Sequence, residues 1–412
     1  MYLNNFSPRA AALALLVVLL TACGGGGGST PTPIPSPTLS NVLGVMVDTG
    51  PTGSGYNVNR LYASVKICQP GSSTQCATVD HVLVDTGSTG LRLLSSVISS
   101  SAPTLSLNRV LGSTGRPLLN CVQFVDNTFV WGPVVTADIV LGGKTAASVP
   151  IQLIADPSFS NPASACSVGG TAMTTAATLG ANGILGLGLF REDCGARCVT
   201  TTHNDIYYTC TSASCSTITG SRVTLDQQLT NPVALFATDN NGILIDLPAV
   251  NSTTANSLTG ALIFGIGTQN NNQLGSGVVL TTSANGHFTT LFAGQSLNTS
   301  FLDTGSNGLF FDSSAIPVCT DSNEGFYCPT SLTSLSATLV GANRVSTSIS
   351  FSIDNATSLF TDARKAVLPS LSGPFGDTTS FDWGLPFFYG RRVFVGIEGQ
   401  TSSLGPGPFF AF

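Results

Sequence analysis

The amino-acid sequence predicts an all-β protein, and three observations support this fold class. Only 9% of the 412 residues are charged, whereas glycine alone contributes 45 residues. Turn-forming residues separate many short runs of alternating apolar and β-branched side chains, a pattern typical of strands rather than helices. One apolar strand-and-turn unit also recurs in each half of the chain. A chain of this length can hold two β domains or lobes.

The repeated unit spans residues 80–94, DHVLVDTGSTGLRLL, and residues 299–311, TSFLDTGSNGLFF. In each copy the apolar run predicts a buried strand. Asp-Thr-Gly-Ser then predicts a tight turn, because glycine tolerates positive φ and Asp and Ser bond to local backbone. The copies place Asp85 and Asp303 in equivalent positions at the ends of their strands.

If the two copies pack about a pseudo-twofold axis, these carboxylates meet. Two carboxylates about 3 Å apart cannot both ionise, so they share a proton. One can then accept a proton from water while the other donates to a carbonyl oxygen, which suffices to hydrolyse an amide. The alternative is that each Asp-Thr-Gly is only a turn. A third copy, Asp48-Thr49-Gly50, lacks the following Gly-Leu and apolar strand, and we interpret it as such a turn.

The two full copies resemble the pepsin-like, two-lobed aspartic peptidase family, and the resemblance extends over roughly residues 60–410. It implies an active-site cleft between pseudo-twofold-related lobes, with Asp85 and Asp303 as the catalytic pair. It also implies that Ser88 and Ser306 bond the outer carboxylate oxygens and that Thr86 and Thr304 tie the loops together. Gly87 and Gly305 complete these supporting turns.

Three further segments resemble parts of that family. Residues 121–143 correspond to its flap hairpin, but no Tyr lies between Tyr62 and Tyr207, so Phe129 and Trp131 are the flap candidates. Residues 182–190 and 383–389 resemble the strands that cross behind the catalytic loops. There, Gly186 and Gly384 would leave room for the close crossing. Arg92 stands where the family usually has Trp, and we favour a structural salt bridge over substrate binding.

The N-terminus predicts export. Arg9 followed by the apolar residues 10–20 indicates a signal peptide over residues 1–22, too short to span a bilayer. Leu-Thr-Ala before Cys23 resembles a bacterial lipobox and implies a lipid on that cysteine, with an ordinary signal peptide as the alternative. Residues 23–40 carry this cysteine and a Gly/Pro-rich linker. The β lobes are expected over residues 41–230 and 231–412, tethered to a membrane, with the outer membrane favoured.

The remaining ten cysteines form an even set in an exported chain, which predicts disulfides. We expect Cys68–Cys76, Cys121–Cys166 and Cys319–Cys328, with Cys194, Cys198, Cys210 and Cys215 nested as two bridges. The spacing of the last four argues against zinc, and no other metal or cofactor is expected. The three histidines, His81, His203 and His287, suggest no catalytic set. A net charge of −6 and the lack of a basic patch argue against nucleic acid as a partner.

Three hypotheses follow. The first is a tethered aspartic endopeptidase whose peptide or protein substrate binds as an added strand. The second is an inactive peptide-binding or protein-binding lipoprotein on the same fold, and the third is a structural envelope lipoprotein. A pair of carboxylates in contact beneath an open cleft would weaken the third hypothesis, whereas a blocked cleft would weaken the first. The sequence is silent on oligomeric state.

Overall fold

The computed structural model describes residues 39–203, 205–212 and 214–412. The all-β prediction is confirmed, since no helix in these residues is longer than five residues. No helix within the described ranges has the length and apolar character needed to cross a membrane. The predicted signal peptide, the lipidation site at Cys23 and all but the end of the linker lie outside the described residues.

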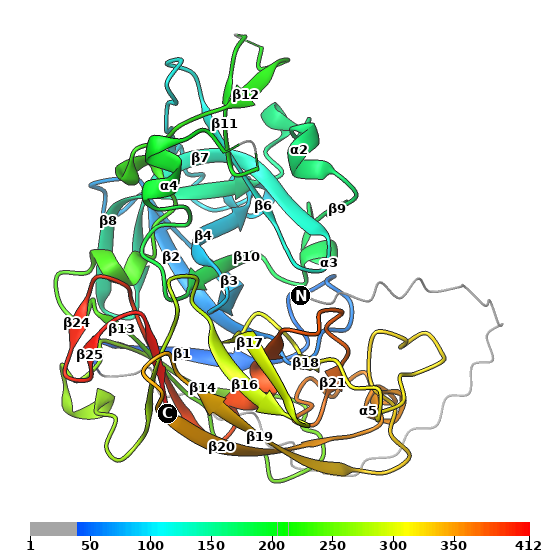
Figure 1. Ribbon diagram of the computed structural model, residues 1–412. Coiled ribbons are helices and arrows are strands. Elements are labelled where there is room, and N and C mark those ends of the chain that lie inside the picture. The colour runs from blue at the N-terminus through cyan, green and yellow to red at the C-terminus, as the bar shows by residue number, and fades with distance from the viewer. Residues whose placement is uncertain (1–38, 204, 213) are drawn as a thin grey trace, which may run out of the picture.

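A central antiparallel sheet joins strands from the beginning, middle and end of the chain (Figure 1). Its consecutive neighbours are β2 (Leu61–Cys68), β1 (Val42–Val47), β14 (Leu258–Phe264), β13 (Gly242–Asp246), β23 (Arg392–Gly396), β26 (Phe409–Ala411) and β15 (Val279–Thr281). Backbone hydrogen bonds therefore join the two predicted lobes, residues 41–230 and 231–412, because β1 of the first pairs along its whole length with β14 of the second.

One three-strand arrangement occurs twice. In the first half, β10 (Gly183–Leu187) pairs parallel with β3 (Cys76–Asp85) and antiparallel with β4 (Thr89–Leu94). In the second half, β22 (Phe381–Trp383) pairs parallel with β17 (Gln295–Leu302) and antiparallel with β18 (Leu309–Phe311). The sequence duplication is thus a duplication of topology. In both copies a later strand inserts between the strand before the Asp-Thr-Gly-Ser turn and the strand after it.

The two halves extend these arrangements differently. The first adds the hairpin of β6 (Leu118–Gln123) and β7 (Thr128–Leu141), and then β8 (Lys144–Ile154). The second adds β16 (Phe288–Phe292), β19 (Thr333–Val340), β20 (Ser346–Ile353) and β21 (Ser372–Gly373). Figure 1 shows β6 and β7 at one end of the molecule and β16, β19 and β20 at the other. Short elements complete the fold: β5 (Asn108–Arg109), β9 (Thr171–Ala172), β11 (Tyr207–Cys210), β12 (Ile218–Gly220), β24 (Thr401–Ser402), β25 (Gly405–Pro406), α1 (Ser95–Ser99), α2 (Ser164–Ser167), α3 (Ala176–Leu179), α4 (Ala196–Thr200) and α5 (Ala356–Leu359).

The apolar core is continuous beneath both turns. Val84 and Leu185 from the first half belong to the same buried cluster as Leu302 and Trp383 from the second. The Trp383 ring stacks on Phe381 with 4.0 Å between ring centroids, and its indole N–H donates to Thr290 at 3.0 Å. Because each buried aromatic side chain contributes a large apolar area, this packing holds the second turn rigidly against the sheet.

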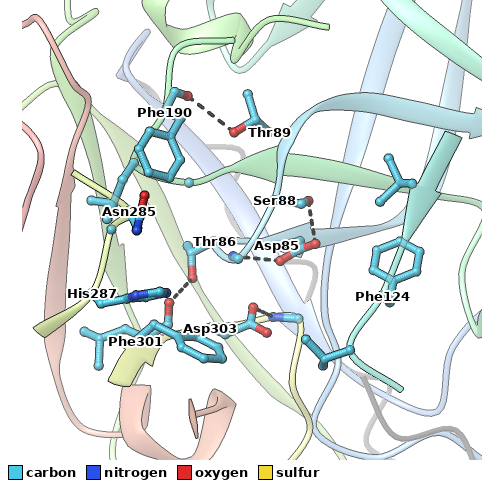
Figure 2. Close-up of a pocket in the computed structure, with 18 of the residues that line it drawn as sticks. Asp85, Thr86, Ser88, Thr89, Phe124, Phe190, Asn285, His287, Phe301 and Asp303 are labelled. Carbon is cyan, nitrogen blue, oxygen red and sulfur yellow. Dashed lines mark hydrogen bonds between the residues drawn. The ribbon is translucent and has the colours of Figure 1, made fainter. Parts of the chain in front are cut away.

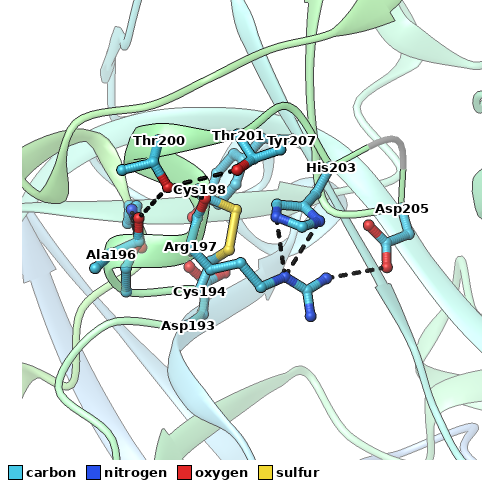
Figure 3. The surroundings of a disulfide bond; sticks show 12 residues. Asp193, Cys194, Ala196, Arg197, Cys198, Thr200, Thr201, His203, Asp205 and Tyr207 are labelled. Atoms are coloured by element: carbon cyan, nitrogen blue, oxygen red, sulfur yellow. Dashed lines mark hydrogen bonds and ion pairs between the residues drawn. A yellow bond between two sulfur atoms is a disulfide. The ribbon is translucent and has the colours of Figure 1, made fainter.

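Five disulfide bonds pair the ten cysteines of the described residues. The predicted Cys68–Cys76, Cys121–Cys166 and Cys319–Cys328 bonds are confirmed. The other four cysteines form two bridges as predicted, but these are consecutive, Cys194–Cys198 and Cys210–Cys215, rather than nested. Short loops close more readily than long ones, which favours such local pairing. Figure 3 shows Arg197, beside the Cys194–Cys198 bond, donating to His203 and facing Asp205.

Candidate active site

The two Asp-Thr-Gly-Ser turns hold their carboxylates in the same way. Asp85 Oδ1 accepts from Gly87 N at 2.8 Å, and its Oδ2 accepts from Ser88 Oγ at 2.5 Å. Asp303 Oδ1 accepts from the N–H of the matching glycine at 2.7 Å, and its Oδ2 accepts from Ser306 Oγ at 2.8 Å. Figure 2 shows the resulting orientation, with both carboxylates at the floor of one cleft. The supporting serines and glycines lie where the sequence predicted.

Two threonines cross-link the turns beneath the carboxylates. Thr304 Oγ1 accepts from Thr86 N at 3.1 Å, and Thr86 Oγ1 accepts from Thr304 N at 3.0 Å. Each hydroxyl then donates to the opposite half, Thr304 to Val84 O at 2.8 Å and Thr86 to Leu302 O at 3.2 Å. Both threonines are buried. The four bonds therefore fix the two turns relative to each other, as the resemblance implied.

The turn glycines let the carboxylates approach. A Cβ atom added to Gly87 would lie 2.8 Å from Asp303 Oδ1. One added to Gly305 would lie 2.7 Å from Asp85 Oδ1 and 3.0 Å from Asp303 Oδ1. Since both Oδ1 atoms are within about 3 Å of that one point, any side chain there would push the two loops apart. The structure therefore brings the two predicted catalytic residues together.

The surroundings of Asp85 favour its protonated form. The residue is only 6% exposed. Burial, followed by the negative charge of Asp303, raises the pKa of Asp85 to about 7, against the stabilising bonds from Ser88 and Gly87. The Asp85 carboxyl therefore keeps its proton over the acidic range, up to about neutral pH. A protonated carboxyl is the form that a general acid requires.

A cleft of about 320 Å³ opens above the pair. Its walls come from both halves of the chain and are largely apolar, with Phe124 and Phe190 on opposite sides of the carboxylates in Figure 2. Phe301 and His287 line the second-half wall. The sequence did not predict a role for His287, because the only feature near it in the sequence is the apolar strand that follows. Burial lowers the pKa of His287, so the neutral imidazole is favoured there.

The β6–β7 hairpin is present next to the cleft, but the flap candidates Phe129 and Trp131 do not line it. Both are buried against other residues of the first half, and Trp131 donates its indole N–H to Phe159 O at 2.9 Å. Successive strand residues face opposite ways. The odd-numbered face of β7 therefore packs on the domain body, while Phe124 at the hairpin tip borders the cleft. The turn residues Asp126 and Asn127 were the sequence signal that could have located this tip.

The crossing-strand glycines Gly186 and Gly384 lie at the predicted close approaches. A Cβ atom on Gly186 would be 2.6 Å from Thr89 N, and one on Gly384 would be 2.1 Å from Gly308 O. These are contacts with backbone atoms of the segments that follow Asp85 and Asp303. The absence of a side chain at both positions is therefore what allows the inserted strands to support the turns.

Arg92 is structural, as the sequence analysis favoured. It is 2% exposed, donates to Thr89 O at 2.7 Å and pairs with Asp193 at 3.4 Å. Asp193 also accepts from the Tyr207 hydroxyl at 2.6 Å. This buried network is anchored on the strand that follows the Asp85 turn, and its residues do not line the cleft.

The third Asp-Thr-Gly copy is a turn, as predicted, and lies outside the cleft lining. Asp48 accepts from Gly50 N at 2.8 Å and faces His81 at 3.2 Å. It therefore provides an internal comparison for the two paired copies.

The chain belongs to the family described as "Protein of unknown function (DUF3443)", whose model matches residues 37–412. No curated protein matches the chain.

Proposed function

We propose that this protein is an aspartic-type endopeptidase in which Asp85 and Asp303 share one catalytic water. The observation that carries the proposal is the pair of carboxyls beneath one cleft, each held by matched donors and joined through Thr86 and Thr304. The same strand arrangement surrounds both turns, and this repeat supports a two-lobed, pepsin-like fold. A duplicated carboxylate site is expected to have such a repeated arrangement.

In this proposal a water lies between the two carboxyls. The ionised member accepts a proton from the water while the protonated member donates to the carbonyl oxygen of the scissile bond. The resulting tetrahedral intermediate collapses with proton transfer to the amine. No side chain of the protein forms a covalent bond during the reaction. The raised pKa of Asp85, about 7, places its proton on the donor member over the acidic range.

The substrate is a polypeptide bound in an extended conformation. The cleft runs beside the tip of the β6–β7 hairpin, where an added strand could bond to exposed backbone. Its apolar walls, including Phe124, Phe190 and Phe301, favour apolar side chains on either side of the cleaved bond. We further propose that Cys23 carries a lipid, which would tether the enzyme at the bacterial outer membrane and restrict it to envelope polypeptides.

The test is cleavage of an unstructured protein by the purified chain between pH 3 and 7, with and without a pepstatin-type inhibitor. Asp85→Asn and Asp303→Asn should each abolish cleavage. Asp48→Asn is the matched control, because it alters the same tripeptide outside the cleft and should leave cleavage unchanged. Loss of activity in the control, or activity surviving in either dyad variant, would refute the assignment.

A peptide-binding protein on the same scaffold is the second candidate. It is favoured by the hairpin tip, where Phe124 borders the cleft without a hydroxyl group that could bond to the catalytic water. Absence of cleavage by the folded protein at every pH, together with peptide binding that Phe124→Ala weakens, would select this alternative.

A further inference from the structure

A third carboxyl group lies behind the catalytic pair. Asp382 is the central residue of β22, 1% exposed, and pairs in register with Phe301 on β17 and Phe310 on β18. Within the part of the chain that the structure describes, Asp382 Oδ1 has no hydrogen-bond partner. Its side chain lies close enough to Ser306 to interact with it, and Ser306 is the residue that donates to Asp303 Oδ2 at 2.8 Å.

The charges around Asp382 oppose its ionisation. The neighbouring strands β16, β17, β18 and β21 carry no ionisable side chain. The charged groups that act on it from the described residues are Asp303 and, more weakly, Asp85. Burial first, and then the charge of Asp303, raise the pKa of Asp382 well above its usual range, against a smaller lowering by Ser306. A buried carboxylate without a cation costs far more than a buried neutral acid.

The single proton of the Ser306 hydroxyl limits the bonds that this residue can form. A serine hydroxyl has one proton to donate, and Ser306 donates it to Asp303. The Ser306 oxygen can still accept a hydrogen bond, and a protonated Asp382 can supply it. Hydrogen bonds in such a chain polarise one another, so the outer donor strengthens the inner one.

We propose that Asp382 is a protonated positioning residue that donates to Ser306 Oγ, commits the Ser306 hydroxyl to Asp303, and thereby makes Asp303 the ionised member of the pair. The first half of the chain has no acidic residue at the equivalent position of its crossing strand. Counting back from the crossing glycines, the position equivalent to Asp382 is Ile184, which pairs with Leu83 and Arg92. Ser88 therefore has no acid behind it from the crossing strand, and Asp85 is left as the proton-carrying member.

The protonation state can be tested without any activity. Asp382→Asn keeps the shape of the side chain and retains a group that can donate to Ser306 Oγ, but it cannot ionise. If Asp382 is neutral in the folded protein and ionised in the unfolded chain, wild-type stability falls relative to the variant as pH rises above about 4, the ordinary Asp range. The ratio of the wild-type to variant unfolding constants should then rise about tenfold per pH unit between about pH 5 and 7, measured by urea unfolding with the disulfides intact.

The same slope is expected when wild type is compared with Asp382→Ile, which copies the Ile184 side chain, so the test survives if one variant fails to fold. Asp226→Asn is the control, because it removes an exposed carboxyl and should give a ratio that does not change with pH. A flat ratio for the Asp382 variants would mean that Asp382 is ionised when folded, and it would overturn the proposal.

The effect on the pair rests on the proposed function and is tested separately. In Asp382→Ile the Ser306 hydroxyl loses its donor, so the pair takes up its second proton more readily. The acidic side of the pH–activity profile should move to higher pH by about one unit or less, the scale of one hydrogen bond. Asp382→Asn should leave the profile in place. A shift to lower pH in either variant would show that Asp382 carried a charge and would refute the assignment. If the wild type cleaves nothing, the unfolding test still decides the protonation state.

Discussion

The threonine cross-link is the feature whose removal gives the sharpest stability prediction. Thr304→Val preserves shape but removes the hydroxyl that accepts from Thr86 N and donates to Val84 O. Thr304 is fully buried, so no water can replace the lost partner. The orphaned Thr86 N–H costs about 1–3 kcal/mol, and the lost bond to Val84 O about 1 kcal/mol more. The expected loss of unfolding free energy is therefore about 2–4 kcal/mol.

The assay is urea unfolding of the disulfide-intact protein at one fixed pH, followed by intrinsic fluorescence. Thr304→Ser retains both hydrogen bonds and should recover most of the loss. Thr78→Val alters an exposed threonine on β3 and should change stability by less than about 0.5 kcal/mol. A Thr304→Val variant that unfolds at the wild-type urea concentration would refute the reasoning, because the cross-link would then contribute nothing to the fold.

Three other perturbations give definite expectations. Gly384→Ala should destabilise the protein by at least about 1–3 kcal/mol in urea unfolding, because the new methyl group would meet backbone oxygen atoms at 2.1 and 2.7 Å. Gly44→Ala, with nothing within 4 Å of the added atom, should not destabilise, and equal losses would contradict the crowding argument. For the proposed peptidase activity, kcat/KM should fall tenfold per pH unit above about pH 7, because Asp85 loses its proton there. A kcat/KM that stays unchanged up to pH 9 would count against this. Removing the Cys121–Cys166 bond, which spans 45 residues, should cost about 4 kcal/mol of unfolding free energy on loop-entropy grounds, and a loss under about 1 kcal/mol would show that the unfolded chain is already restrained.

Much of the candidate site could be predicted because its determinants are local. The Asp-Thr-Gly-Ser turns require residue types that few other positions tolerate, and both copies fold alike. The glycines at the strand crossings can also be recognised from their neighbours in the sequence, although the atoms that would clash with a side chain come from elsewhere in the chain. Proximity in sequence predicted three of the five disulfides, whereas the consecutive pairing of the other four cysteines differed from the nested prediction.

What could not be predicted depends on register and on distant partners. The flap candidates Phe129 and Trp131 were wrong because the prediction lacked the position of a single turn, and moving that turn by one residue exchanges the two faces of β7. Asp382 stands in an apolar run and carries no local signal of its role. The role proposed for it depends on the pairing of β22 with β17, which brings it near Ser306, a residue far away in the sequence.

The two halves of the chain place different residues behind two nearly identical turns, and this difference bears on the roles proposed for Asp85 and Asp303. Across the crossing strands, the first half pairs Ile184 with Arg92, whereas the second pairs Asp382 with Phe310. The buried charge of the first half is compensated within its own network, because Arg92 pairs with Asp193. The acid of the second half has no such counterion and interacts with Ser306, which donates to Asp303. A symmetric pair of carboxyls would have no preferred donor. In the proposed mechanism, the difference between the residues behind the two turns would supply that preference without altering the turns themselves.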